Sequence, residues 1–109
     1  MSATVQINVC STEDLPSGAV KVVVHDERTI AVFNAEGALY AIEDRCTHDD
    51  GPLAEGEFDP EECVVACPRH GAEFDIRSGS ALTLPAYRPV ETFAVEAEDG
   101  RVVLTVPAT

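Results

Sequence analysis

The sequence predicts an all-β protein, built as an antiparallel β-sandwich or barrel. Short runs rich in β-branched residues alternate with turn residues along the chain, and helical periodicity is weak throughout. Val20, Val22 and Val24 share one face of their run, which is the two-residue alternation of a strand. The length of 109 residues is that of one ordinary domain, so we expect a single domain over residues 1–109.

The expected strands follow one another closely except in one place. Residues 11–18 read as a loop with one helical turn, residues 19–43 as an antiparallel meander, and residues 92–106 as a final hairpin. The expected strands are residues 5–9, 19–25, 28–34, 38–43, 63–66, 73–76, 81–84, 92–97 and 101–106. The exception is residues 45–62, a glycine- and proline-containing stretch predicted to be irregular. A loop of that length is uncommon unless it serves a function or is disordered, and a metal centre would order it.

Charge and composition narrow the classes of partner. The formal net charge is −13, with 20 acidic residues against 7 basic ones, so nucleic acid and anionic membrane surfaces would repel the chain. The acidity suits partners with basic docking patches, and it is explained equally well as a means of staying soluble. Neither a secretory signal nor a membrane span is expected, and we expect a cytoplasmic monomer. Four cysteines in such a chain favour metal binding or free thiols over a disulfide framework.

Two short motifs bracket the irregular stretch. Cys46-Thr-His48 opens it and Cys67-Pro-Arg-His70 closes it, with 18 residues between His48 and Cys67. Each motif offers one soft thiolate and one imidazole. A single zinc ion could take all four ligands, although structural zinc sites usually present closely spaced pairs such as Cys-x-x-Cys. One ligand of each type on each of two loops favours an asymmetric two-iron cluster, in which both thiolates hold one iron and both imidazoles hold the other.

These motifs resemble the two cluster-binding boxes of the Rieske family. The boxes here read Cys46-Thr-His-Asp-Asp-Gly-Pro-Leu53 and Cys67-Pro-Arg-His-Gly-Ala-Glu-Phe-Asp75, and Leu84-Pro-Ala-Tyr-Arg-Pro89 is similar to the proline-bearing loop that shields the cluster. The resemblance covers nearly the whole chain and is nearest to the stand-alone ferredoxins of bacterial aromatic-ring dioxygenase systems. It implies a Rieske fold, with a smaller cluster-binding subdomain over about residues 44–90.

The same resemblance assigns the cofactor and its ligands. It implies one Rieske-type 2Fe–2S cluster, with Cys46 and Cys67 on the inner iron and His48 and His70 on the outer, more exposed iron. A cluster with four protein ligands leaves no open position for a substrate. The resemblance therefore implies an electron carrier rather than an enzyme.

Neighbouring residues indicate the low-potential branch of that family. High-potential members carry Ser and Tyr where this chain has Ala72 and Phe74, and their hydroxyls donate hydrogen bonds at the cluster. They also carry one extra cysteine in each box, at positions held here by Arg69 and by Gly51 or its neighbours. Fewer donors to the sulfurs disfavour the reduced state, so we expect no inter-loop disulfide and a potential of roughly −150 mV. Histidine ligation further implies a potential that depends on pH in alkaline solution.

Several reactive residues fall outside the motifs. We expect His25 to be a strand-end histidine, and Cys10 and Cys63 to be small hydrophobic residues. Cys63 and Cys67 are about 13 Å apart on an extended segment, too far for a disulfide. Arg69 and Arg88 either line the surface through which the electron leaves or pair with the abundant carboxylates.

The predicted function is electron transfer from a flavin-dependent reductase to a terminal ring-hydroxylating oxygenase, through the exposed histidine edge. Two alternatives keep the cluster and change the acceptor: a nitrite reductase small subunit, or a ferredoxin of iron–sulfur assembly. A third alternative is a non-redox module stabilised by zinc.

Overall fold

The fold consists of two antiparallel sheets of unequal size. A computed structural model describes residues 3–47, 51–69 and 71–108. The larger sheet has six strands in the order β1-β9-β8-β4-β3-β2. Its strands are β1 (Thr4–Ser11), β2 (Val20–His25), β3 (Arg28–Ala35), β4 (Ala38–Glu43), β8 (Thr92–Glu98) and β9 (Arg101–Pro107). This architecture confirms the predicted all-β fold and the meander of β2, β3 and β4.

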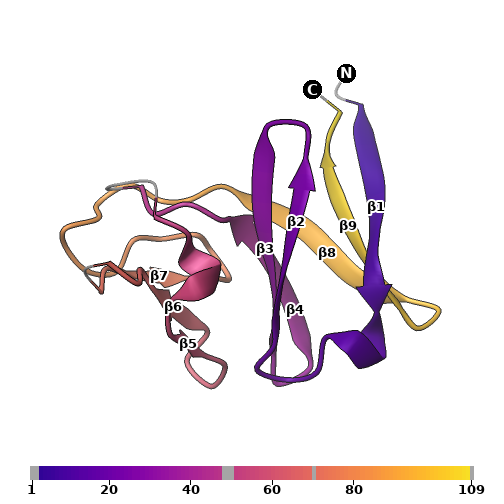
Figure 1. The fold of residues 1–109 in the computed structure, drawn as a ribbon, viewed down its shortest axis with the longest axis horizontal. Helices are drawn as coiled ribbons and strands as arrows, with labels where there is room; N and C mark the ends of the chain where they lie inside the picture. The colour runs from indigo at the N-terminus through magenta and orange to yellow at the C-terminus, as the bar shows by residue number, and fades with distance from the viewer. Residues whose placement is uncertain (1–2, 48–50, 70, 109) are drawn as a thin grey trace.

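The smaller sheet lies at the end of the molecule away from the two chain termini (Figure 1). It contains β5 (Phe58–Asp59), β6 (Val64–Ala66) and β7 (Glu73–Asp75), paired in that order. Two single-turn 3-10 helices complete the elements, η1 (Thr12–Asp14) and η2 (Leu53–Glu55). The turn in the predicted loop of residues 11–18 is therefore confirmed as η1.

Two sequence-based expectations were wrong in this smaller part. The stretch of residues 45–62 contains η2 and β5 instead of being irregular throughout. Residues 81–84 do not form a strand: Ala81 makes one isolated bridge to Phe74, and Leu82 and Leu84 turn out to solvent. Their alternating pattern suits a strand, but no neighbouring strand extends far enough to pair with them.

Strand β3 separates two hydrophobic cores because both of its faces are buried. Ile30 and Val32 point into a core shared with β9, whereas Ala31 and Phe33 point into a core shared with the smaller sheet. Phe33 packs edge-on against Phe58 of β5, with ring centroids 4.8 Å apart, and so joins the two sheets. The larger sheet thus provides the wall on which the smaller one is built.

Within the described residues, no helix has the length and apolar character that crossing a membrane requires.

Candidate metal centre

The first predicted ligand loop leaves the end of β4. Cys46 is fully buried, and its backbone N–H donates to the carbonyl of Gly51 at 2.7 Å, which closes a short loop. Asp44 braces the return of this loop, because its carboxylate accepts a 2.7 Å hydrogen bond from the backbone N–H of Ala54. Partial burial raises the pKa of the Asp44 carboxyl, and the bond from Ala54 opposes that rise.

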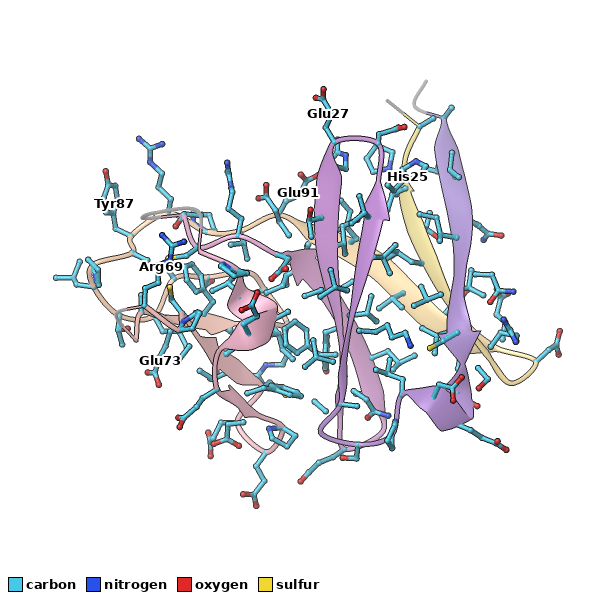
Figure 2. The ribbon with its side chains drawn as sticks, viewed as in Figure 1. His25, Glu27, Arg69, Glu73, Tyr87 and Glu91 are labelled. Atoms are coloured by element: carbon cyan, nitrogen blue, oxygen red, sulfur yellow. The ribbon has the colours of Figure 1, made fainter. Side chains whose placement is uncertain are left out.

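The second ligand loop joins β6 to β7 and is closed in the same way. The backbone N–H of Cys67 donates to the carbonyl of Ala72 at 2.8 Å, and the N–H of Gly71 donates back to the Cys67 carbonyl at 2.9 Å. Gly71 has φ +77°, a left-handed conformation that glycine adopts without strain. Arg69 is exposed on this loop (Figure 2). In both loops the cysteine N–H reaches the carbonyl five residues further on.

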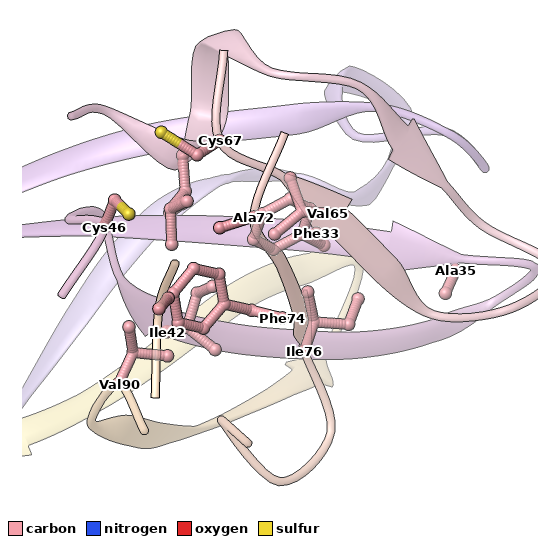
Figure 3. Close-up of a cluster of buried hydrophobic side chains, with 13 residues drawn as sticks. Phe33, Ala35, Ile42, Cys46, Val65, Cys67, Ala72, Phe74, Ile76 and Val90 are labelled. Atoms are coloured by element: carbon pink, nitrogen blue, oxygen red, sulfur yellow. The ribbon is translucent and has the colours of Figure 1, made fainter. Parts of the chain in front are cut away.

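The two loops bring their thiols to the same place. Cys46 and Cys67 are 0% and 2% exposed and belong to one hydrophobic cluster. Figure 3 shows both sulfur atoms at one end of that cluster, with Ala35 at the other end. All four cysteines of the chain are free. Two buried, unoxidised thiols held by backbone bonds are suitable donors for a soft metal centre.

The other two predicted ligands, His48 and His70, lie outside the described residues, as do Asp49 and Asp50. The described parts of the chain contain no group of three or more histidine, cysteine or acidic side chains placed to hold a metal ion. The ligand set Cys46, His48, Cys67 and His70 therefore stays a prediction.

A third segment, residues 82–90, lies beside both ligand loops; we call it the covering segment. Its Ala86 and Val90 are buried in the same cluster as the two cysteines. The hydroxyl of Thr47, next to Cys46, donates a 2.7 Å hydrogen bond to the carbonyl of Arg88. Backbone bonds from Leu82 and Val90 fix the two ends of the segment. The proline-bearing loop is thus attached to the first ligand loop, as its proposed shielding role requires.

The residues that distinguish the potential classes are deeply buried. Ala72 and Phe74 are both 0% exposed and pack in the cluster that holds the two thiols. Neither side chain carries a polar hydrogen. A hydrogen bond from either of these side chains to a cofactor sulfur is therefore impossible.

An ion pair fixes the turn after β7. Arg77 donates from Nε and Nη2 to the two carboxylate oxygens of Asp75, at 3.1 and 3.0 Å. These bonds hold the pKa of the Asp75 carboxyl below its usual range. The turn follows β7, the strand into which the second predicted ligand loop leads, and fixes the end of that strand.

Of the three residues expected to be uninvolved, Cys10 lies in the other core, whereas Cys63 packs against the cluster that holds Cys46 and Cys67. Cys10 is buried in the core on the far side of β3, as a small hydrophobic residue. Cys63 is half-buried in the β5–β6 turn, with φ +58°. His25 ends β2, with its Nε2 3.5 Å from the carboxylate of the neighbouring Asp26. The expectations for Cys10 and His25 are confirmed.

Two residues that matter to the site were missed by the sequence analysis. The position of Thr47 between two predicted ligands could have drawn attention to it. Its hydrogen-bond partner, the carbonyl of Arg88, is 41 positions away and could not be predicted. No signal in the sequence marked Gly56. A Cβ at Gly56 would lie 1.7 Å from the carbonyl oxygen of Ala66, so only glycine allows the two chain segments to approach so closely.

Comparison with known proteins identifies the family. A family model described as the Rieske [2Fe-2S] domain matches residues 5–94. The chain therefore belongs to the Rieske [2Fe-2S] family, and its cofactor is a single Rieske-type 2Fe–2S cluster. The mononuclear zinc alternative has no support from this match.

The relatives within that family are ferredoxin subunits. The chain is 39% identical over 101 residues to the 3-phenylpropionate/cinnamic acid dioxygenase ferredoxin subunit of Photorhabdus laumondii, covering 93% of this chain and 94% of that protein. Its fold matches the ferredoxin of carbazole 1,9a-dioxygenase from Nocardioides aromaticivorans, with a TM-score of 0.86 at 26% identity over 91% and 95% of the two chains. It also matches a ferredoxin of Sphingomonas yanoikuyae B1, with a TM-score of 0.84 at 30% identity over 94% and 100%.

The alternative of a nitrite reductase small subunit is supported by similarity of fold alone. A structure described as a putative nitrite reductase small subunit matches with a TM-score of 0.75, at 21% identity over 92% of this chain and 97% of that one. That identity supports the architecture and says nothing about the acceptor.

Proposed function

We propose that this chain is the ferredoxin component of an aromatic-ring-hydroxylating dioxygenase system. It takes single electrons from a flavin-dependent reductase, delivers them to a terminal oxygenase, and is not itself an enzyme. The observation that carries this proposal is the end-to-end match with a dioxygenase ferredoxin subunit, which leaves almost none of either chain unmatched.

We propose Cys46, His48, Cys67 and His70 as the cluster ligands, with the cysteines on the inner iron and the histidines on the outer one. The shared burial of Cys46 and Cys67 and the matched closure of their loops support this assignment. The bound cluster supplies a one-electron couple. The chain's own residues bury the thiols, fix the two loops and withhold hydrogen bonds at positions 72 and 74.

A similar ferredoxin supports the choice of acceptor. The chain has a TM-score of 0.85 and 32% identity with a chain from a structure described as a complex of reduced oxygenase and oxidised ferredoxin in carbazole 1,9a-dioxygenase. We propose the equivalent partner for this chain, together with a reductase as electron donor.

The ligand assignment is tested by matched substitutions. Cys46→Ser, Cys67→Ser, His48→Ala and His70→Ala are each expected to abolish the Rieske EPR signal and the iron content. Cys10→Ser and His25→Gln serve as controls of the same residue types, and both should keep two irons per chain. An intact EPR signal in any of the four ligand variants would contradict the assignment.

The function is tested by following the cluster's absorbance in both directions. The oxidised protein is mixed with NADH and a dioxygenase reductase, and the reduced protein is then mixed with an oxidised terminal oxygenase in a stopped-flow instrument. We use the 3-phenylpropionate dioxygenase proteins of Photorhabdus laumondii as the probe. We expect fast reduction followed by reoxidation that depends on oxygenase concentration. A loaded protein that the oxygenase cannot reoxidise would refute the proposed function.

A further inference from the structure

The covering segment ends against a buried glycine. Gly79 lies in the turn that follows β7, and it is buried although the residues on either side of it are exposed. The backbone N–H of Val90 donates to the carbonyl of Gly79 at 2.8 Å. Val90 is itself only 4% exposed and packs in the cluster that holds Cys46 and Cys67. The last residue of the covering segment therefore rests directly on this glycine.

A side chain at position 79 would have no room. A Cβ there would lie 2.3 Å from the carbonyl oxygen of Val90, 3.3 Å from its carbonyl carbon and 3.1 Å from Cγ2 of Thr92. The nearest of these atoms belongs to the backbone, so it cannot rotate out of the way. Gly79 also has φ +81°, a left-handed conformation that favours glycine. The missing side chain is thus what lets the turn and the covering segment approach so closely.

The turn that carries this glycine is held by its own bonds. The N–H of Gly79 donates to the carbonyl of Asp75 at 2.8 Å, and the N–H of Asp75 donates to the carbonyl of Ser80 at 2.9 Å. The Asp75 carboxylate also accepts the two bonds from Arg77. Residues 75–80, which we call the β7 turn, therefore form a fixed support against which the covering segment packs.

We propose that Gly79 is a positioning residue for the 2Fe–2S cluster. It sets how closely the end of the covering segment packs against the cluster of side chains around Cys46 and Cys67, and through that packing it limits the access of water to the cofactor. Gly79 acts through Val90 and needs no contact with the cofactor. This inference rests on the proposed function only through the ligand set, and it does not depend on which protein accepts the electron.

The direction of the effect on the reduction potential follows from charge. Two ferric ions, two sulfides, two thiolates and two neutral imidazoles sum to zero, so the oxidised centre is neutral and the reduced centre is anionic. Water stabilises the anionic form more than an apolar surrounding does. Letting water in should therefore favour reduction and raise the potential.

Gly79→Ala tests the proposal. We expect amide hydrogen exchange over residues 82–90 to become about tenfold faster, while exchange over residues 4–11 of β1 stays at the parent rate, and we expect voltammetry to show a raised potential. Gly100→Ala is the matched control. Gly100 has φ +78°, but a Cβ there meets nothing within 4 Å, so this variant reports backbone strain alone and should change neither readout.

A second measurement uses the parent protein and is independent of whether Gly79→Ala folds. Hydrogen exchange in rising denaturant should show residues 75–80 and 82–90 opening together, with the same denaturant dependence, because each supports the other. A covering segment that opens while the β7 turn stays protected would overturn the proposal. A Gly79→Ala protein with the parent's exchange rate over residues 82–90, or with faster exchange and an unchanged potential, would overturn it as well.

These readouts involve neither a reductase nor an oxygenase. A parent protein that reduces no oxygenase would refute the proposed function and leave the exchange rates and the potential of the Gly79→Ala protein as expected. Parent values of both quantities in Gly79→Ala would refute the positioning role and leave the proposed function standing.

Discussion

Replacing Gly56 with alanine should disturb the metal centre from outside the ligand set. The added Cβ would lie 1.7 Å from the carbonyl oxygen of Ala66, 2.9 Å from its carbonyl carbon and 3.2 Å from Cδ of Pro68. Because Gly56 has φ −87°, alanine could adopt its backbone conformation. The conflict is therefore one of space alone. To restore a normal contact, η2 and β6 must separate by more than about 1 Å.

The expected change in the free energy of unfolding is the balance of a gain in the unfolded chain and a cost in the folded protein. A Gly→Ala change at a compatible position stabilises a protein by about 0.4–1 kcal/mol through the unfolded chain. Overpacking against rigid backbone costs about 1–3 kcal/mol, so we expect a net loss of about 1–2 kcal/mol and a fall in Tm of roughly 5–10 °C. Because Ala66 directly precedes Cys67, the shift should also reach a proposed ligand and lower cluster retention.

The assay combines a thermal melt followed by circular dichroism with iron content and visible absorbance per chain. Gly18→Ala is the control: a Cβ there meets nothing within 4 Å, but φ is +86°, so this variant reports backbone strain without a clash. A Gly56→Ala protein with the parent's Tm and full cluster content would refute the reasoning.

Three further changes probe the surroundings of the centre. Ala72→Ser should raise the reduction potential, because a buried hydroxyl next to the thiols can donate a hydrogen bond to the cofactor; voltammetry showing a lower potential would contradict this. Thr47→Val should lower the local stability of the covering segment by about 1 kcal/mol, because the bond to the Arg88 carbonyl is lost. Hydrogen exchange over residues 82–90 measures this local stability. Unchanged protection would show that Thr47 does not hold the segment. Asp75→Asn should lower the Tm at about pH 7. The Asp75 carboxyl has a lowered pKa, so its pairing with Arg77 stabilises the fold above the usual pKa of about 3.9 and is lost as pH falls through the lowered value. The Tm difference from the parent should therefore narrow below about pH 4, and a constant difference across that range would show that the ion pair is not its source.

The parts of the fold that could be predicted are those with a repeating or chemically specific signal. Residues 28–34 form a short run with β-branched residues between two predicted turns, and that pattern places β3 correctly even though both of its faces are buried. The two Cys-His motifs and the spacing between them predicted a metal centre without any knowledge of tertiary structure. Soft ligands at fixed spacing have few other uses.

The parts that could not be predicted depend on contacts between distant segments. β5 is only two residues long, and its pairing with β6 gives too short a pattern to detect. Residues 81–84 show a strand-like pattern, yet their pairing with β7 stops at the bridge from Ala81 to Phe74 and the bond from Leu82 to Glu73. The need for glycine at position 56 comes from the carbonyl of Ala66, ten positions away, and nothing in the composition of either segment indicates that contact.

Two sets of residues lie at the metal centre: the buried cluster around the two thiols, and the exposed side chains of the covering segment. The closed loops around Cys46 and Cys67, with Ala72 packed behind them, determine the environment of the cofactor and hence its potential. Leu84 and Tyr87 are exposed on the covering segment and lie outside the buried cluster that holds the two thiols. Thr47 links the two sets, because its hydroxyl donates a hydrogen bond to the covering segment while its backbone adjoins Cys46. Thr47→Val should therefore disturb both the covering segment and the loop that holds Cys46, whereas a change at exposed Leu84 or Tyr87 should leave that loop unaltered.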